Sequence, residues 1–212
     1  KRSDEPSVTE EEVRVLIEQG EQTNVLAAIE EEIMEQVFRL SDRTVSVIMT
    51  PRRDIVWFQV GDTPAEIRDT VLAHGHSRYP VARSDLDDVI GVVMVKDLLA
   101  SHIAEQPIDL AALSQPALYV PESMQALDVI ERLRETRSHM ALVIDEYGGL
   151  EGLVTFTDIM RAILGDLPDN KGQREEPVIQ RADGTWLVDG MYPVDEFQDT
   201  FEIREMPHED EA

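Results

Sequence analysis

The segment GLVTFTD, Gly152 to Asp158, decides the fold because it is the second copy of a repeated frame. Sixty-one positions earlier the chain reads GVVMVKD, Gly91 to Asp97. Both copies contain a glycine, an apolar run and an aspartate six positions after the glycine, a pattern that predicts a buried strand leading into a helix. The copies differ at one position that matters chemically, where Met94 corresponds to Thr155.

The sequence around both copies also repeats, from residue 45 to residue 165. Each half predicts the same order of elements: strand, helix, strand, polar turn, strand and helix. At the offset of 61, Ser77 aligns with Ser138, and Tyr79–Val81 aligns with Met140–Leu142. A shared offset and a shared order predict a tandem α/β (α+β) repeat. Each copy, at about sixty residues, would be only marginally stable alone, so we expect the two to pack face to face around a pseudo-twofold axis.

This pattern divides the chain into four parts. Residues 1–44 are an acidic helical linker, and residues 45–106 are a first repeat. Residues 107–166 are a second repeat, and residues 167–212 are a linker with the start of a further domain. The first part predicts two helices, the second with an apolar stripe of Ile29, Ile33 and Val37. The last part predicts a hairpin and the beginning of a helix, too little for an independent core, and we interpret it as a domain cut short or disordered.

Composition excludes several functional classes. With 44 acidic against 19 basic residues, the chain has a formal net charge of −25 and would repel nucleic acid, so we expect no nucleic-acid partner. There is no cysteine, hence no disulfide or thiolate chemistry. The apolar run Val89–Val95 is far too short to span a bilayer. We therefore expect a soluble piece of a longer protein.

Motifs of catalysis are missing as well. The five histidines have no companions at metal-ligand spacing, and no G-x-S-x-G, Walker A or G-x-G-x-x-G motif occurs. No nucleophile and base can be paired from the sequence. We expect neither a catalytic nor a metal site, and we expect that the protein is not an enzyme.

The polar pair Thr155 and Asp158 suggests a ligand site in the second copy. A strand that ends at Thr155 and a helix that begins near Asp158 would bring a hydroxyl, a carboxylate and free N–H groups together, which suits phosphate and ribose. Gly152 would allow close backbone approach. The alternative is an ordinary helix cap. Met94 provides no comparable hydroxyl, so Asp97 is expected to cap its helix, where it could also pair with Lys96.

At this point the motifs resemble a known family. Two tandem units ending in strand, G-h-h-T-x-x-D and helix resemble CBS domains, which pair into a Bateman module. The resemblance covers nearly the whole chain and narrows to the cytoplasmic region of the CorC/CNNM magnesium and cobalt efflux proteins, and equally to TerC- or DUF21-linked and hemolysin-type homologues. It rests on VIMTPRRDI, GHSRYPV, VKDLL, HMALVIDEYGGLEGLVTFTDI and DGTWLVDGMYPVDEF. The last of these resembles the start of a CorC/HlyC-type transporter-associated domain.

The resemblance implies binding of an adenine nucleotide, ATP or AMP, at the second site only, with Mg²⁺ possible on its phosphates. Arg78 stands where family members place a phosphate-contacting arginine, although it could be a surface arginine. Ser77 lies beside it in the sequence, and Ser138 and His139 are weaker candidates nearby. The adenine is expected between apolar edges formed by residues that would be core in any case: Tyr119, Val120 and Met140.

Together these features predict a regulatory CBS pair of a membrane ion transporter, on the cytoplasmic face of the membrane. The resemblance implies a homodimer of CBS modules and a transmembrane domain upstream in the same chain. Two alternatives stay open: a dimerisation scaffold that has lost ligand binding, and a redox or flavin partner whose cofactor would belong to the terminal domain.

Overall fold

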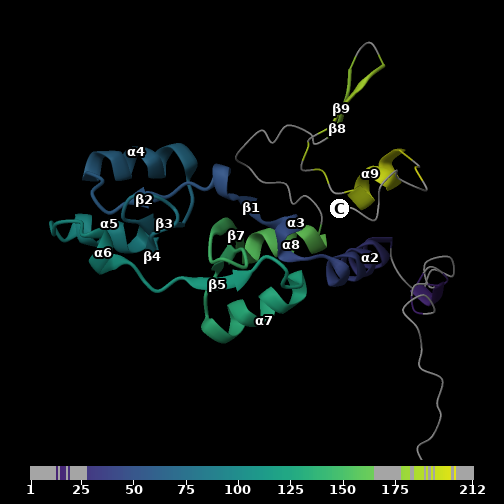
Figure 1. The fold of residues 1–212 in the computed structure, drawn as a ribbon, viewed down its shortest axis with the longest axis horizontal. Coiled ribbons are helices and arrows are strands. Elements are labelled where there is room, and N and C mark those ends of the chain that lie inside the picture. The colour runs from purple at the N-terminus through teal and green to yellow at the C-terminus, as the bar shows by residue number, and fades with distance from the viewer. Residues whose placement is uncertain are drawn as a thin grey trace, which may run out of the picture. The chain divides into compact units, whose positions relative to one another are not determined.

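The computed structural model (Figure 1) describes residues 28–164 without interruption. It also describes shorter pieces, namely residues 13, 15–17, 19, 178–181, 184–188, 190, 192, 194–201 and 203. The chain forms two compact units, Lys1–Asp166 and Leu167–Ala212. Among the described helices, none is both long and apolar enough to cross a bilayer. The first of the two expected acidic helices falls largely outside the described residues.

The first repeat contains a three-stranded sheet in the order β2-β3-β4. β2 and β3 run parallel, whereas β3 and β4 run antiparallel. Thr63 caps the start of its first long helix, Pro64 lies in the first turn, and Gly75 caps the end in the left-handed conformation. The elements are β2 (Phe58–Gln59), α4 (Pro64–His74), β3 (Arg78–Ala82), β4 (Val89–Met94), α5 (Val95–Ile103) and α6 (Leu110–Leu113).

The second repeat has the same plan within a four-stranded sheet of order β1-β7-β6-β5. Its long helix α7 ends at Arg137, which adopts a φ of 53° at the position equivalent to Gly75. The elements are β1 (Thr50–Pro51), β5 (Leu118–Pro121), α7 (Ala126–Thr136), β6 (Met140–Ile144), β7 (Leu150–Thr155) and α8 (Phe156–Leu164).

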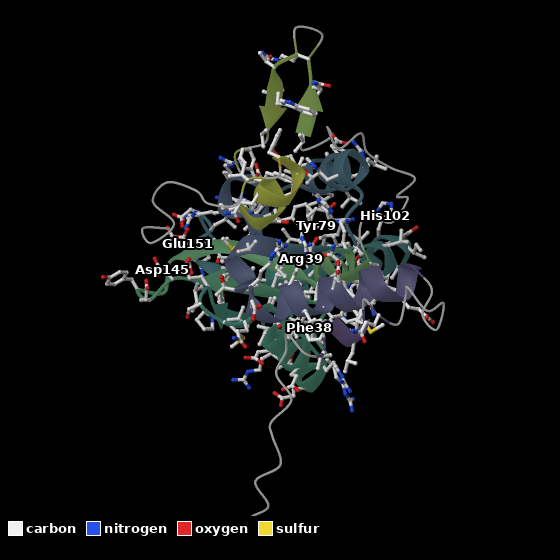
Figure 2. The ribbon with its side chains drawn as sticks, turned by 90° about the vertical axis from the view of Figure 1, so that its right-hand side faces the viewer. Phe38, Arg39, Tyr79, His102, Asp145 and Glu151 are labelled. Carbon is white, nitrogen blue, oxygen red and sulfur yellow. The ribbon has the colours of Figure 1, made fainter. Side chains whose placement is uncertain are left out.

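The two hairpins have the same register but different lengths. In the first, Val81 lies opposite Gly91; in the second, Val143 lies opposite Gly152. The glycines are therefore 61 positions apart, as predicted, but the valines are 62 apart. The cause is the loop, which spans residues 83–88 in the first hairpin and only 145–149 in the second. Asp145, the first residue of the shorter loop, and Glu151, in β7 just after it, are labelled in Figure 2.

This difference corrects the predicted alignment of the first strands. The backbone N–H of Val95 donates to the carbonyl of Ser77, and the N–H of Phe156 donates to the carbonyl of His139. Ser77 is therefore equivalent to His139, not to Ser138 as the uniform offset predicts. By the same shift Arg78, which lies opposite Met94, is equivalent to Met140.

The opening segments of the two repeats are exchanged between them. α3 (Val45–Ile48) and β1 open the first repeat in the sequence, yet β1 pairs with β7, and α3 packs against α7, α8 and β7 of the second. Gln115 belongs to the opening segment of the second repeat, yet it bridges Val92 of the first, and α6 packs against β4. Each repeat thus completes its fold with the segment that introduces the other.

Gly91 and Gly152 make this exchange possible. A β-carbon at Gly152 would lie 2.7 Å from the carbonyl oxygen of Thr50, and one at Gly91 would overlap the carbonyl oxygen of Gln115. The close backbone approach predicted at Gly152 is therefore present, but it is made by the exchanged strand of the same chain.

The apolar core of residues 28–164 has three parts. One lies in each repeat, and the third joins the repeats, as expected for face-to-face packing. The buried residues of this joint core are Ile55, Leu86, Met140, Leu142, Leu150 and Leu153. The long helix α2 (Ala28–Asp42) lies beside α8 (Figure 1) and packs against α8 and α7. Its Leu40 is buried in the core of the second repeat.

A polar contact adds to the joint core. The Arg52 guanidinium in the 3₁₀ turn η1 (Arg52–Asp54) donates to the Asp87 carboxylate and, at 3.0 Å, to the carbonyl oxygen of Leu150. Asp87 belongs to the hairpin loop of the first repeat, and Leu150 begins β7 of the second. This contact holds the pKa of Asp87 below its usual value, and the hydrogen bond with Arg52 is the largest cause.

The second unit contains the predicted hairpin and helix. β8 (Val178–Gln180) pairs antiparallel with β9 (Trp186–Val188), and α9 spans Val194–Phe201. The rings of Trp186 and Phe201 meet edge to face, with centroids 5.4 Å apart. Trp186 still exposes 48% of its surface, so the described part of this unit buries little apolar area.

Candidate functional site

Thr155 and Asp158 form hydrogen bonds with one another where β7 ends and α8 begins. The Asp158 Oδ2 atom accepts from the backbone N–H of Thr155 at 2.9 Å and from its hydroxyl at 2.7 Å. In return the Asp158 N–H lies 3.2 Å from the Thr155 Oγ1 atom, to which it donates. The two residues therefore form a reciprocal N-terminal cap, which is the alternative that the sequence left open.

The cap leaves part of the pair accessible. The Asp158 side chain exposes 19% of its surface, and Thr155 is neither buried nor fully exposed. Because Oδ2 takes both hydrogen bonds from Thr155, Oδ1 is the oxygen that can accept from a ligand. It lies 3.6 Å from the Nη1 atom of Arg161, one turn further along α8. Sequence reasoning missed Arg161, although its i,i+3 spacing from Asp158 could have indicated it.

The first repeat lacks this arrangement. Met94 occupies the N-cap position of α5, and no side chain caps that helix. The expectation that Asp97 caps it is wrong, because the methionine offers no hydroxyl for a reciprocal pair and Asp97 makes no such bond to the Met94 N–H. The position equivalent to Arg161 is Ala100. Only the second repeat carries the three polar groups.

His76 of the first repeat lies within electrostatic reach of this pair. Burial lowers the pKa of His76, the charge of His74 lowers it further, and the charge of Asp158 raises it. His76 donates its backbone N–H to the hydroxyl of Tyr79 at 3.2 Å, and the two rings meet edge to face. The start of β3 is thus near enough to the start of α8 for the charge of Asp158 to act on His76.

Arg78 and Ser77 follow directly at the start of β3. Arg78 is partly buried, and its Nη1 atom donates to the Ser77 hydroxyl at 3.3 Å. Both residues follow His76 directly in the chain. On the second repeat, the Ser138 hydroxyl donates to the carbonyl of Met140 at 2.8 Å, so it is already used within its own strand.

The three residues expected near an adenine differ in exposure. Tyr119 exposes 45% of its surface and donates its hydroxyl to the carbonyl of Val89, at 3.4 Å, across the two repeats. Burial and the charge of Asp88 raise the pKa of Tyr119. Val120 and Met140 expose 1% and 7%, so they are core, and Val120 could reach a ligand only through its backbone.

A metal centre is not evident in the part of the chain that the structure describes, where no group of three or more histidines and carboxylates is arranged to hold an ion. In that part, every buried side-chain nitrogen and oxygen atom has a hydrogen-bond partner.

Comparison with known proteins places this geometry in a family. The CBS-domain model matches residues 45–103 and 109–165. Among relatives, a UPF0053 protein of Synechocystis sp. is 45% identical over 97% of this chain, and the polyamine export protein of Escherichia coli (strain K12) is 32% identical over 94%. The chain spans about half the length of these relatives, 46% and 45% respectively.

Solved structures agree with this assignment. The CBS domain of a bacterial CNNM/CorC family Mg²⁺ transporter is 34% identical, with a TM-score of 0.71, over 76% of this chain and 99% of that one. The same kind of domain in complex with ATP is 36% identical, with a TM-score of 0.61, over 65% and 99%. A CBS pair with bound AMP from Klebsiella pneumoniae is 28% identical, with a TM-score of 0.50, over 57% and 98%.

These matches and the exchanged tandem repeat agree with one another and with the resemblance drawn from the motifs. The chain belongs to the CBS-domain family, as a CBS pair of the CorC/CNNM and hemolysin-like UPF0053 group.

Proposed function

We propose that this chain is the regulatory CBS pair of a membrane ion transporter and that it binds an adenine nucleotide between its repeats. The observation that carries the proposal is the Thr155–Asp158 pair, which is partly exposed and has no counterpart in the first repeat. Support comes from similar CBS domains whose structures contain ATP or AMP.

Asp158 is the group we assign to the ribose. Its Oδ2 atom is held by Thr155, so its Oδ1 atom has a defined direction and can accept hydroxyl protons. Thr155 supports this role through its cap, which fixes the carboxylate. The choice between ATP and AMP depends on how the site accommodates additional phosphates.

Arg78 and Ser77 are the groups we assign to the phosphates. A chain of net charge −25 needs local positive charge to hold an anion, and Arg78, two residues after His76 at the start of β3, provides a guanidinium. Mg²⁺ on the phosphates would lower the repulsion further. Tyr119, with the backbone of Val120 and the edge of Met140, would border the base.

The proposed output runs through α2. This helix packs against α8, whose first turn contains Asp158, and against α7. A nucleotide that favours one position of α8 would shift α2, provided that its affinity differs between the two arrangements. In the complete protein this change would alter the pairing of two CBS modules in a homodimer and reach an upstream transmembrane domain from its cytoplasmic side.

Isothermal titration calorimetry tests the binding step. The wild-type chain should release or absorb heat with ATP and Mg²⁺ or with AMP. Thr155→Ile, which removes the hydroxyl, should weaken binding by about tenfold or more, since a lost charge-assisted hydrogen bond is worth about 1.5–3 kcal/mol. Met94→Ile, at the equivalent position of the first repeat, is the matched control and should bind like the wild type. Equal affinity in all three proteins would refute the site.

A ligand-free dimerisation scaffold is the second candidate. Its supporting observation is the exposure of apolar side chains on the helices of the first repeat, with Leu72 at 76% and Ile103 at 72%. Analytical ultracentrifugation with and without nucleotide separates the candidates. If the fraction of dimer is the same with and without nucleotide but falls in Leu72→Glu, the scaffold is favoured.

A further inference from the structure

Arg161 contacts the proposed ribose-binding carboxylate from the side away from Thr155. Its Nη1 atom lies 3.6 Å from Asp158 Oδ1, whereas Thr155 bonds only to Oδ2. Both partners of this ion pair are largely shielded, with side-chain exposures of 23% for Arg161 and 19% for Asp158. The two oxygens of the carboxylate are thus held by two different partners.

The distance determines what Arg161 can do. At 3.6 Å the ion pair is longer than an ordinary hydrogen bond, so the lone pairs of Oδ1 remain available to a hydroxyl donor. The guanidinium charge still attracts Oδ1 and restricts rotation of the carboxylate about its terminal torsion, which is otherwise broad. Thr155 and Arg161 together therefore define the direction in which Oδ1 faces.

The comparison of the repeats separates Arg161 from an ordinary helix charge. The first repeat keeps an aspartate at the equivalent position, Asp97, but it has Met94 in place of the threonine and Ala100 in place of the arginine. Both partners of the carboxylate are absent together. If the arginine only stabilised its helix, we would not expect it to be present in the repeat that has the threonine and absent from the repeat that lacks it.

We propose that Arg161 is a positioning residue that holds the Oδ1 atom of Asp158 where a nucleotide ribose donates its hydroxyl protons. The inference rests on the proposed nucleotide site and adds a residue to it. It assigns to Arg161 an effect on affinity that passes through the ribose hydroxyls, not through the phosphates or the stability of the fold.

The test compares variants of the 212-residue chain by calorimetry. The ligands are ATP with Mg²⁺ and AMP, each also as its 2′-deoxy and 3′-deoxy form. Arg161→Gln should weaken the ribonucleotide about three- to fivefold, the range expected for loss of a partly shielded ion pair. Arg161→Lys should restore affinity to within about twofold of the wild type, because the ammonium also attracts Oδ1.

The deoxy ligands provide the signature of positioning. If Arg161 acts through Asp158 on a ribose hydroxyl, the effect of Arg161→Gln should shrink to less than about 1.5-fold for at least one deoxy form, as in a double-mutant cycle. Arg132→Gln is the matched control, since Arg132 also forms an i,i+3 ion pair, with Glu135 at 3.3 Å, but on the exposed face of α7. It should leave every affinity unchanged.

Each other outcome contradicts the inference. An equal loss for ribose and deoxy ligands would mean direct phosphate contact or structural damage, and a melting curve of the unliganded variant would tell which. Wild-type affinity in Arg161→Gln would overturn the inference alone and leave the nucleotide site standing. No binding by the wild-type chain to either nucleotide would overturn both.

Discussion

Substituting alanine for the two glycines of the repeated frame tests the exchange of segments. In Gly91→Ala the new β-carbon would overlap the carbonyl oxygen of Gln115 and lie 3.1 Å from the β-carbon of Ser114. The Gln115 carbonyl accepts from the N–H of Val92 at 2.8 Å, so it cannot move without weakening that bond. Overpacking costs about 1–3 kcal/mol and a weakened hydrogen bond about 0.5–1.5 kcal/mol. We expect a loss of about 2–4 kcal/mol in the free energy of unfolding.

Gly152→Ala should cost less. Its β-carbon would lie 2.5 Å from the sulfur of Met49, which is the far part of a flexible side chain, and 2.7 Å from the carbonyl oxygen of Thr50. The methionine can move and the carbonyl cannot, so we expect about 1–3 kcal/mol. Gly61→Ala is the control, because nothing lies within 4 Å of its β-carbon and its φ is not positive. It should stabilise by about 0.4–1 kcal/mol.

Urea unfolding followed by fluorescence measures these differences. Trp57 packs against the joint core, and the chain has one other tryptophan, Trp186, in the second unit. In a Trp186→Phe background the signal therefore reports on the repeats. The order of stability should be Gly61→Ala, wild type, Gly152→Ala and Gly91→Ala. If Gly91→Ala unfolds within about 0.5 kcal/mol of Gly61→Ala, the close approach that underlies the exchange is refuted.

Three further predictions concern single contacts. Thr155→Val keeps the shape of the side chain but removes the hydroxyl of the cap, and it should lower the free energy of unfolding by about 1 kcal/mol, measured in urea. Arg137→Gly should raise the melting temperature by about 2–4 °C, because a φ of 53° is strained for arginine and natural for glycine; a fall would contradict this. Asp87→Asn removes the partner of Arg52. Because the folded pKa of Asp87 is depressed, its stabilising effect is present above pH of about 4 and is lost as the pH falls through the lower folded value. The unfolding curves of wild type and Asp87→Asn should therefore converge in acid, and a constant gap would contradict the assignment.

Local signals made much of the fold predictable. Thr63, Pro64 and Gly75 mark the two ends of α4 by capping chemistry that acts within a few residues. The frame around Gly91 and Gly152 revealed the repeat, because burial and a strand-to-helix junction both limit the residue types allowed there.

What the sequence did not predict depends on contacts between distant residues. The loop of the second hairpin is one residue shorter, which shifts the alignment of Ser77 from Ser138 to His139, and nothing in the strands themselves indicates the shift. The exchange of the opening segments cannot be predicted from local sequence either, because the sequence around Thr50 would suit a strand in either sheet.

The candidate site shows the same division. Thr155 and Asp158 were predictable as a polar pair, since three positions separate them at a helix start. Their mutual bonding depends on the rotamers of both side chains, and the nearness of His76 depends on how the repeats pack. Arg161 follows from helical spacing once Asp158 is taken as a fixed point.

The exchanged opening segment also determines where a mechanical load would enter the molecule. α2, α3 and β1 all lie against the second repeat, although α2 precedes the first repeat in the chain and α3 and β1 open it. A torque applied at Ala28 would therefore reach the junction of β7 and α8 without passing through the first repeat. In terms of transmitted force, α2 is coupled directly to the repeat that comes second in the sequence.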